Sequence, residues 1–385
     1  MDVEMSPELN EMRSALRRFV TSALEPMARR MDETNTVPDE LVPLLRDNGY
    51  LGMRLDPELG GGGIGLAAYC LTIEEFARSH RYFTLALDYS SGLTPAAIAK
   101  HGTKAQQAKY LTGLVSGTTQ ASFALTEPDA GSDSASMRTR AEKIEDGWKI
   151  NGRKHYISGG GDADFILLLA VTDPEKRARG GITAFLIDRG TPGFSVTREE
   201  ETISSIIKLA ELTFEDCVVP DEAVLGRVGG GFAVAMETLT SGRLGVSCAC
   251  IGAADRLLEM SVDHARSRTT FGEKLSERQA IQWMLADSAI ELRAARAMVY
   301  DTLRQVEAGA EVGTAASMCK VYCSEMVGRV ADRAVQIHGG MGLVRSYPVE
   351  RFYRDIRHYR VGEGTSEIQR MLIARGLFKD AESRA

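Results

Sequence analysis

A glutamate stands between two glycines just before the last predicted helix. In Gly362-Glu363-Gly364 the glycines let the backbone approach a ligand and give the carboxylate room to move. Thr365 and Ser366 follow at the helix start, where backbone N–H groups are available to an anion. One interpretation is a catalytic carboxylate. The alternative is a helix N-terminus with an electrostatically favourable acidic residue.

Two further segments combine residue types that suit phosphate or heterocycle binding. Thr126 to Asp133 follows a predicted strand and offers hydroxyls, a glycine and backbone N–H groups, although an ordinary polar turn would look the same. Arg266 to Gly272 lies where a helix ends, and an arginine followed by hydroxyls can hold a pyrophosphate. The alternative for this segment is a helix C-terminus whose basic residues interact favourably with the helix dipole.

The composition is that of an ordinary globular chain. The 385 residues predict two or three domains, and the net charge of −7 argues against a broad nucleic-acid surface. No apolar run reaches the roughly 18 residues of a membrane span. The N-terminus is acidic and no signal core follows, so we expect a cytoplasmic protein. The six cysteines form no CxxC pair and no histidine lies near Cys319 and Cys323, which favours buried thiols and no metal site.

The spacing of apolar residues divides the chain into three blocks. Residues 1–120 follow a period close to 3.6 and predict a helical domain. Its expected helices are Glu8 to Ala28, Pro38 to Leu45, Leu66 to Ala77 and Ala105 to Leu114.

Residues 121–228 predict a β domain, because short apolar runs alternate with Gly, Pro and Asp. Glu145-Asp146-Gly147 is typical of a hairpin turn. The expected strands are Ala121 to Leu125, Thr139 to Ile144, Trp148 to Ile150, Phe165 to Val171, Ile182 to Ile187, Phe194 to Thr197 and Leu209 to Phe214.

Residues 229–385 return to long helices, which makes the expected fold class α+β, with a β domain between two helical blocks. Ser366 and Gln369 predict a capping box at the start of the last helix. The expected helices pass through Ile281 to Leu292, Thr314 to Ile337, Arg351 to Arg360 and Ser366 to Phe378.

Taken together and in order, these motifs resemble those of the acyl-CoA dehydrogenase family. The resemblance covers roughly residues 7 to 379 and implies an N-terminal helical domain, a β-barrel-like middle domain and a C-terminal four-helix bundle. The segments that carry it are Phe123 to Asp133, Ile150 to Ser158, Arg268 to Gly272, Gln336 to Gly342, Tyr347 to Glu350, Arg354-Asp355 and Glu363 to Arg370.

The resemblance implies α,β-desaturation of an acyl-CoA thioester, with FAD as the hydride acceptor and an electron-transfer flavoprotein as the next carrier. Glu363 matches the family's base, for which burial beside an apolar thioester should raise the pKa. Some members carry the base on an earlier helix, at the position that is Gly242 here, and glycine cannot act as a base.

The same resemblance assigns cofactor residues. Tyr156 matches the aromatic that stacks on the flavin, and Ser158 matches the hydroxyl that bonds flavin N5. Phe123, Leu125 and Thr126 match residues that line the flavin. A second set matches contacts to the FAD of a neighbouring subunit or at the last helix, which implies a dimer, usually a dimer of dimers. Its members are Arg268, Phe271, Gln279, Gln336, Gly339, Gly340, Thr365 and Glu367.

Four residues are expected at the substrate. Ser132 matches a phosphate or CoA contact, Arg243 matches a CoA-binding arginine, and Gly364 belongs to the loop that holds the thioester. Arg81 matches an arginine that members of the glutaryl-CoA type use to bind a distal carboxylate. The alternative is that Arg81 reaches solvent or pairs with Asp88.

The chain also departs from the family. Gly362 replaces a residue that is usually aromatic, Thr240 an acidic residue and Tyr89 a small one, and residues 203–209 lack the usual Gly-x-Arg-x-Ser pattern. These departures put a plain straight-chain substrate in doubt.

Two other functions stay open beside the dehydrogenase. One is an acyl-CoA oxidase or another flavin enzyme of the same fold. The other is a flavin-bearing nucleic-acid-binding relative, which the net charge disfavours.

Overall fold

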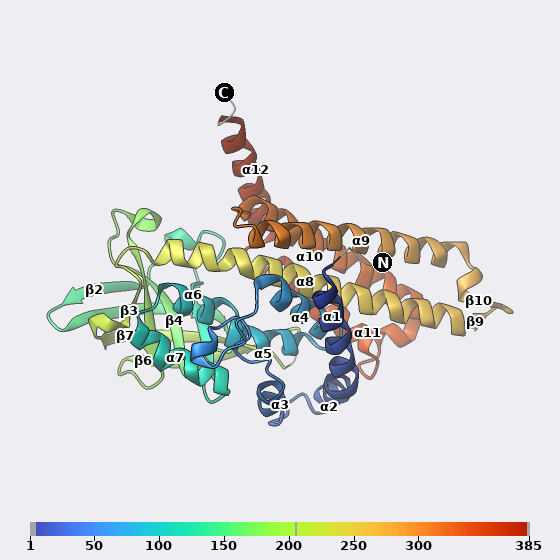
Figure 1. Ribbon diagram of the computed structural model, residues 1–385, viewed down its shortest axis with the longest axis horizontal. Helices are drawn as coiled ribbons and strands as arrows, with labels where there is room; N and C mark the ends of the chain where they lie inside the picture. The colour runs from blue at the N-terminus through green and yellow to red at the C-terminus, as the bar shows by residue number, and fades with distance from the viewer. Residues whose placement is uncertain (1–4, 205, 383–385) are drawn as a thin grey trace. The chain divides into compact units, whose positions relative to one another are not determined.

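The computed structural model describes residues 5–204 and 206–382 and separates into two compact units. The helical unit comprises Met1–Pro38, Gly65–Thr84 and Thr240–Ala385. The sheet unit comprises Asp39–Ile64 and Leu85–Leu239. The α+β class is confirmed: along the chain, the strands of the sheet follow N-terminal helices and precede C-terminal helices. Figure 1 colours these segments by residue number. The division into domains 1–120, 121–228 and 229–385 follows chain order rather than packing, and it stays a prediction.

The helical unit contains the long helices expected near the C-terminus. The predicted helix Glu8 to Ala28 is confirmed in substance, although a π-helical turn at Val20–Leu24 divides it. Helices α9 and α10 lie side by side (Figure 1), where Arg333 donates to Glu291 at 2.8 Å. The helices are α1 (Pro7–Phe19), α2 (Glu25–Thr34), α4 (Leu66–Phe76), the start of α5 (Arg81–Ser91), most of α8 (Gly231–Ser267), α9 (Gln279–Glu307), α10 (Gly313–His338), α11 (Pro348–Asp355) and α12 (Ser366–Glu382).

The capping box predicted at Ser366 and Gln369 is wrong in its residues. The hydroxyl of Thr365 accepts from Ile368 N–H at 3.3 Å, so the capping hydroxyl belongs to the preceding residue. The amide of Gln369 turns instead to the carbonyls of Glu363 and Gly364. A capping pattern cannot distinguish two neighbouring hydroxyl residues, because either can precede the first helical turn.

The sheet unit is built on one mixed sheet with the strand order β6-β7-β3-β2-β4-β5-β8, and β1 pairs with β4 in parallel. Its strands are β1 (Ala121–Ala124), β2 (Arg140–Ile144), β3 (Gly147–Ser158), β4 (Phe165–Val171), β5 (Ile182–Asp188), β6 (Phe194–Glu201), β7 (Lys208–Val219) and β8 (Val224–Leu225). Its remaining helices are α3 (Leu41–Asp47), α6 (Leu93–His101) and α7 (Lys104–Ser116).

Strand β3 does not end at Ile150 as predicted. It continues to Ser158, and its pairing with β7 shifts register after Ile150 and again after Lys154. Gly152 adopts φ +145°, which lets the strand pass the first irregularity. The second irregularity lies between Lys154 and Ile157 and contains Tyr156.

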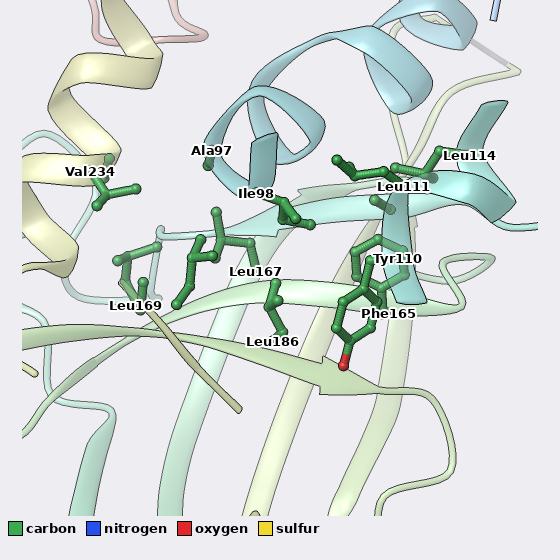
Figure 2. Packing of buried hydrophobic residues seen from close by; sticks show 14 of the residues in the cluster. Ala97, Ile98, Tyr110, Leu111, Leu114, Phe165, Leu167, Leu169, Leu186 and Val234 are labelled. Atoms are coloured by element: carbon green, nitrogen blue, oxygen red, sulfur yellow. The ribbon is translucent and has the colours of Figure 1, made fainter. Parts of the chain in front are cut away.

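Strand β4 is buried on both faces, which explains its unbroken apolar sequence. Phe165, Leu167 and Leu169 pack with α6 and α7, where Figure 2 shows them near Ile98 and Leu111. The alternate residues Ile166, Leu168 and Ala170 belong to a second cluster on the other face, together with Phe185 and Trp148. Successive side chains of a strand point to opposite faces, so a single strand contributes to both clusters.

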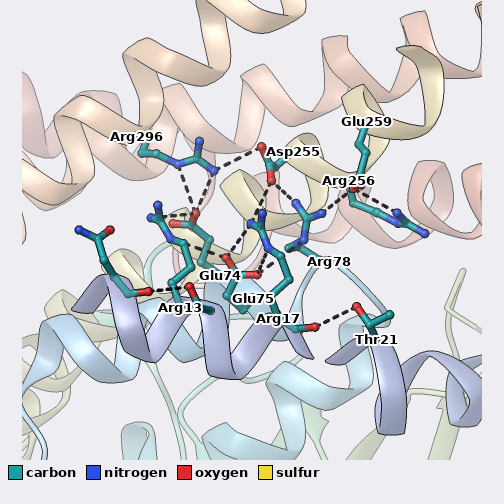
Figure 3. Close-up of polar contacts among 12 residues, drawn as sticks. Arg13, Arg17, Thr21, Glu74, Glu75, Arg78, Asp255, Arg256, Glu259 and Arg296 are labelled. Atoms are coloured by element: carbon teal, nitrogen blue, oxygen red, sulfur yellow. Dashed lines mark hydrogen bonds and ion pairs between the residues drawn. The ribbon is translucent and has the colours of Figure 1, made fainter. Parts of the chain in front are cut away.

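The helical unit buries charges as well as apolar groups. Glu74 accepts from Arg296 at 2.9 Å, and Glu75 accepts from Arg17 at 2.9 Å (Figure 3). Glu74 also accepts from the Tyr300 hydroxyl at 2.8 Å. We call this set the charge network. Its members are Arg13, Arg17, Glu74, Glu75, Arg78, Asp255, Glu259, Arg296 and Tyr300. The six cysteines are all buried thiols, as expected.

Candidate active site

Glu363 lies on a tight turn that joins a 3₁₀ helix, Ile356–Arg360, to α12. Its backbone is left-handed, with φ +54°, and Gly364 continues at φ +89°. Such a conformation is costly for a residue with a side chain and persists only where neighbours hold it. Lys320 Nζ donates to the Gly364 carbonyl at 2.7 Å, and Gln369 Nε2 donates to the Glu363 carbonyl at 2.9 Å.

Two buried cations face the Glu363 carboxylate. Arg243, on α8, is only 7% exposed, and its Nε has no hydrogen-bond partner in the described part of the chain. Burial lowers the pKa of Arg243, and the charge of Glu363 opposes that effect. Lys320, on α10, is fully buried, and burial lowers its pKa to about 8 against the attraction of Cys250 and Glu363. A buried arginine with an unused donor is suited to an anionic ligand.

The space left by Gly362 is filled by a histidine. A side chain at position 362 would bring its Cβ within 2.6 Å of His358 Nε2. Burial and the charges of Arg81 and Lys320 hold the pKa of His358 well below its usual range, so its imidazole is neutral at pH 7. A side chain at position 362 would therefore collide with a neutral, polar ring.

Arg81 begins α5 and lies with its guanidinium carbon 5.8 Å from the centre of the Tyr359 ring. Both residues line a small cavity together with Ser79 and Arg351. In the sheet unit, Asp88 accepts a hydrogen bond from the backbone of Leu93, at the junction of α5 and α6.

The aromatic ring expected against the flavin is displayed by a bulge. Tyr156 adopts φ +60°, is 56% exposed and stacks on His155 with 4.0 Å between ring centres. His155 N–H donates to the Thr126 carbonyl at 2.9 Å, and Ser122 Oγ donates to the Ser158 carbonyl at 2.9 Å. These bonds bring together the ends of β1 and β3.

The other predicted residues of this unit lie around the same strand ends. Phe123, Leu125, Thr126 and Ser158 are partly exposed, whereas Ser132 is exposed in the turn that follows β1. A planar heterocycle needs an exposed aromatic face with hydroxyl and backbone donors nearby, and this surface supplies them. The residues present therefore fit a flavin. The departure Tyr89 also belongs to this unit, where its hydroxyl lies close to Gly159.

A buried ion pair fixes the turn that carries Thr126. Lys154 Nζ donates to Glu127 Oε1 at 2.8 Å and to the Leu125 carbonyl at 2.9 Å. Glu127 also accepts from the backbone N–H groups of Arg138 and Thr139. Burial lowers the pKa of Lys154 to about 8 despite the attraction of Glu127.

The residues predicted to face a partner subunit lie on two exposed parts of the helical unit. The first is a two-residue hairpin between β9 (Thr269–Thr270) and β10 (Glu273–Lys274), where Phe271 adopts φ +51° and is 98% exposed. Arg268 and Gln279 are exposed on either side of it. The second part is the end of α10, where Gln336, Gly339 and Gly340 are exposed.

Ring contact between His264 and His338, 4.5 Å apart, links the helices that carry these two parts. Of the residues expected at α12, Thr365 is partly exposed and Glu367 exposed.

Sequence reasoning assigned no role to Lys320, His358, Lys154 or Glu127, and it gave Gln369 only a place in a capping box. Lys320 did leave a signal, because it lies between the buried residues Ala316 and Cys323 on the apolar face of its helix. A lysine at core spacing is rare unless it has a partner. Lys154 could have been noticed as a lysine inside a predicted strand segment. The spacing of His358 and Glu127 in the sequence gives no indication of their contacts.

No cluster of three or more His, Cys, Asp or Glu side chains among the described residues could hold a metal ion. None of the helices in residues 5–204 and 206–382 is both long and apolar enough to cross a membrane.

Comparison with known proteins yields matches along almost the whole chain. The family models of the acyl-CoA dehydrogenase N-terminal, middle and C-terminal domains match residues 6–118, 122–217 and 229–378. Acryloyl-CoA reductase (NADH) of Anaerotignum propionicum is 37% identical over 98% of this chain and 96% of its own length. The caffeyl-CoA reductase-Etf complex subunit CarC of Acetobacterium woodii is 37% identical over 91% of this chain and 92% of its own.

Solved structures agree with these matches. Butyryl-CoA dehydrogenase from Megasphaera elsdenii superposes with a TM-score of 0.92 at 34% identity, covering 98% of this chain and 100% of that one. PigA, solved with FAD and proline, superposes with a TM-score of 0.93 at 27% identity over 98% of this chain and 99% of that one.

Proposed function

The chain belongs to the acyl-CoA dehydrogenase family, and we propose that it converts an acyl-CoA thioester to the 2-enoyl-CoA with Glu363 as the base. It is an oxidoreductase, and its cofactor is FAD. The observation that supports the proposal most directly is the setting of Glu363, a carboxylate on a tightly held left-handed turn beside two buried cations.

FAD, when bound, supplies the acceptor for the hydride that leaves the β-carbon. We assign Tyr156, Phe123, Leu125, Thr126 and Ser158 to its ring system. The exposed ring of Tyr156 gives a stacking surface, and the Glu127–Lys154 ion pair holds the turn that carries Thr126.

Glu363 removes the α-proton while the thioester carbonyl becomes more negative. The Glu363 backbone N–H is the proposed donor to that carbonyl, and Gly364 leaves room for the thioester. Arg243, buried with an unused donor, is the proposed partner of an anionic group of CoA, and Ser132 is a second CoA or phosphate contact.

The proposed assembly is a homo-oligomer, a dimer or tetramer, in the cytoplasm. An exposed phenylalanine at a hairpin tip suggests that Phe271 contacts another subunit, with Arg268, Gln279, Gln336, Gly339 and Gly340 reaching the partner's FAD. We propose Thr365 and Glu367 as further cofactor contacts. CarC is named as part of an Etf complex, which supports an electron-transfer flavoprotein as the next electron carrier.

The assembly proposal can be tested through FAD retention. Arg268→Ala should lose FAD faster on dilution and melt at a lower temperature, because a ligand bound only to the native form stabilises it. Arg304→Ala, an exposed arginine of α9, serves as the control. A monomer that holds FAD as tightly as the wild type would contradict the shared site.

A second candidate function is the reverse reaction. Two relatives are named as reductases of acryloyl-CoA and caffeyl-CoA, and Glu363 would then protonate the α-carbon.

An acyl-CoA oxidase of the same fold is the remaining alternative. Anaerobic mixing with acyl-CoAs should bleach the flavin and keep it bleached until an acceptor is added. Rapid reoxidation by oxygen would favour the oxidase.

The base is tested by Glu363→Gln, which keeps the shape of the side chain and removes its proton affinity. Flavin reduction by acyl-CoA should slow by about 10²–10⁴-fold, the range of general base catalysis. Glu311→Gln, an exposed glutamate before α10, is the matched control. Near-normal reduction by the Glu363→Gln variant would overturn the assignment.

The acyl group is tested at Arg81. If the guanidinium binds a distal carboxylate, glutaryl-CoA should be preferred to butyryl-CoA, and Arg81→Ala should reverse that preference. A wild-type preference for butyryl-CoA that the substitution leaves unchanged would limit Arg81 to its contact with Tyr359.

A further inference from the structure

Two consecutive residues at the proposed base are left-handed, and their carbonyls are bonded from two different helices. Lys320, on α10, donates to Gly364 O at 2.7 Å. Gln369, in α12, donates to Glu363 O at 2.9 Å and to Gly364 O at 3.3 Å. Both side chains are fully buried. A strained turn that is bonded from two sides cannot relax without breaking these hydrogen bonds, and their buried donors would then be left without an acceptor.

We propose that Lys320 and Gln369 are positioning residues that hold the Glu363 turn in the conformation needed for proton transfer. The proposal rests on the proposed role of Glu363. Neither side chain touches the substrate in this scheme, and both act through the backbone carbonyls of the turn.

The glycine at position 364 supports the same conclusion. A Cβ there would lie 2.6 Å from Gln369 Nε2, so the close approach of the amide requires glycine. The two hydrogen bonds of Gln369 therefore depend on the absence of a side chain at Gly364.

The choice of lysine adds a charge effect. A buried lysine is costly, and an apolar side chain of similar length would pack at this position without that cost. The groups that face Lys320 are Arg243 and Cys250 on α8, Glu363 and Glu367 at α12, and His358. Among them Glu363 and Glu367 carry negative charge, so the ammonium group favours the ionised form of the proposed base.

Three substitutions separate the hydrogen bond from the charge. Lys320→Met removes both, Lys320→Gln keeps a donor without the charge, and Gln369→Leu removes the second tether. Ser324→Ala is the matched control, because Ser324 is equally buried on the same helix and donates only to Val321. Each FAD-loaded variant is compared by stopped-flow flavin reduction with saturating acyl-CoA, from pH 6 to 9.

Lys320→Met and Gln369→Leu should each slow flavin reduction by about 10- to 100-fold, the effect of one lost charged or buried hydrogen bond. KM should change little. The acidic limb of the rate profile should move to higher pH in Lys320→Met and Lys320→Gln but not in Gln369→Leu.

Glu363→Gln separates failure of this proposal from failure of the proposed function. If Glu363→Gln is inactive while Lys320→Met and Gln369→Leu keep the wild-type rate and pH profile, the tether is refuted and the base survives. If Glu363→Gln remains active, the proposed function fails first. Should Lys320→Met not fold, the unchanged pH profile of Lys320→Gln would refute the charge effect, and the rate of Gln369→Leu would decide the tether.

Discussion

One strand of the sheet unit and one helix of the helical unit bury side chains of opposite character. Strand β4 of the sheet unit places apolar side chains on both of its faces, one of which is drawn in Figure 2, whereas α4 of the helical unit buries Glu74 and Glu75 among arginines (Figure 3). An apolar core gains stability roughly in proportion to the area it buries and tolerates substitutions that preserve volume. A buried charge network adds little net stability to the fold, but removing one partner leaves a buried charge uncompensated and strongly destabilises the protein. We therefore expect substitutions of similar size to lower the free energy of unfolding by different amounts in the two units.

The largest expected effect comes from breaking the charge network at one residue. Glu74→Leu removes the carboxylate that accepts from Arg296 and from the hydroxyl of Tyr300, and it should lower the free energy of unfolding by about 3–5 kcal/mol. Adding Arg296→Met should restore part of that loss. Urea unfolding of the FAD-loaded protein, followed by circular dichroism, measures both. Additive losses in the double variant would show that the two side chains do not act as a pair.

An apolar deletion in the sheet unit should cost slightly less and show no such rescue. Leu168→Ala removes a fully buried side chain and should lower the free energy of unfolding by about 2–5 kcal/mol. Leu168→Met keeps the volume and should cost less than about 1.5 kcal/mol. The same urea titration applies. If Leu168→Met proved as damaging as Leu168→Ala, shape rather than volume would control this core.

The sheet unit also contains one buried ion pair, and its lysine should make stability depend on pH. The pKa of Lys154 is lowered by burial from 10.5 to about 8, so between these values the unfolded chain binds more protons than the native one. Stability should therefore rise with pH from about 8 to 10.5, relative to Lys154→Met. Melting temperatures of both proteins across this window test the sign. Parallel curves would mean that Lys154 titrates normally.

The smallest effect is expected where charges are exposed. Lys143 and Asp221 are 2.8 Å apart but about half exposed, at 49% and 60% of their side-chain surfaces. Lys143→Ala should change the free energy of unfolding by at most about 1 kcal/mol, and added salt should remove the difference. A loss as large as that of Glu74→Leu would show that burial does not separate the two kinds of ion pair.

Local patterns were sufficient for most elements of the fold. The apolar run of β4 and the hairpin turn at Gly147 were predictable, because alternation and turn residues depend on neighbours in the chain. The extension of β3 to Ser158 was not, since bulges at Gly152 and Tyr156 interrupt the alternation that defines a strand. Helices α5 and α6 also escaped prediction. The buried positions of α5 do follow helical spacing, but two of them are Ser90 and Ser91, which a search for apolar periodicity does not register.

The candidate residues of the site were proposed from the sequence alone, because the Gly-Glu-Gly turn and the ordered motifs are local features of the chain. The contacts that hold these residues became visible only in the folded chain. Lys320 reaches the Gly364 carbonyl, and His358 fills the space above Gly362, through the packing of helices distant in sequence or the fold of a turn. Such contacts depend on where the backbone places residues that are distant in sequence. The charge states of the groups depend on their burial. Neither can be predicted from a local sequence pattern.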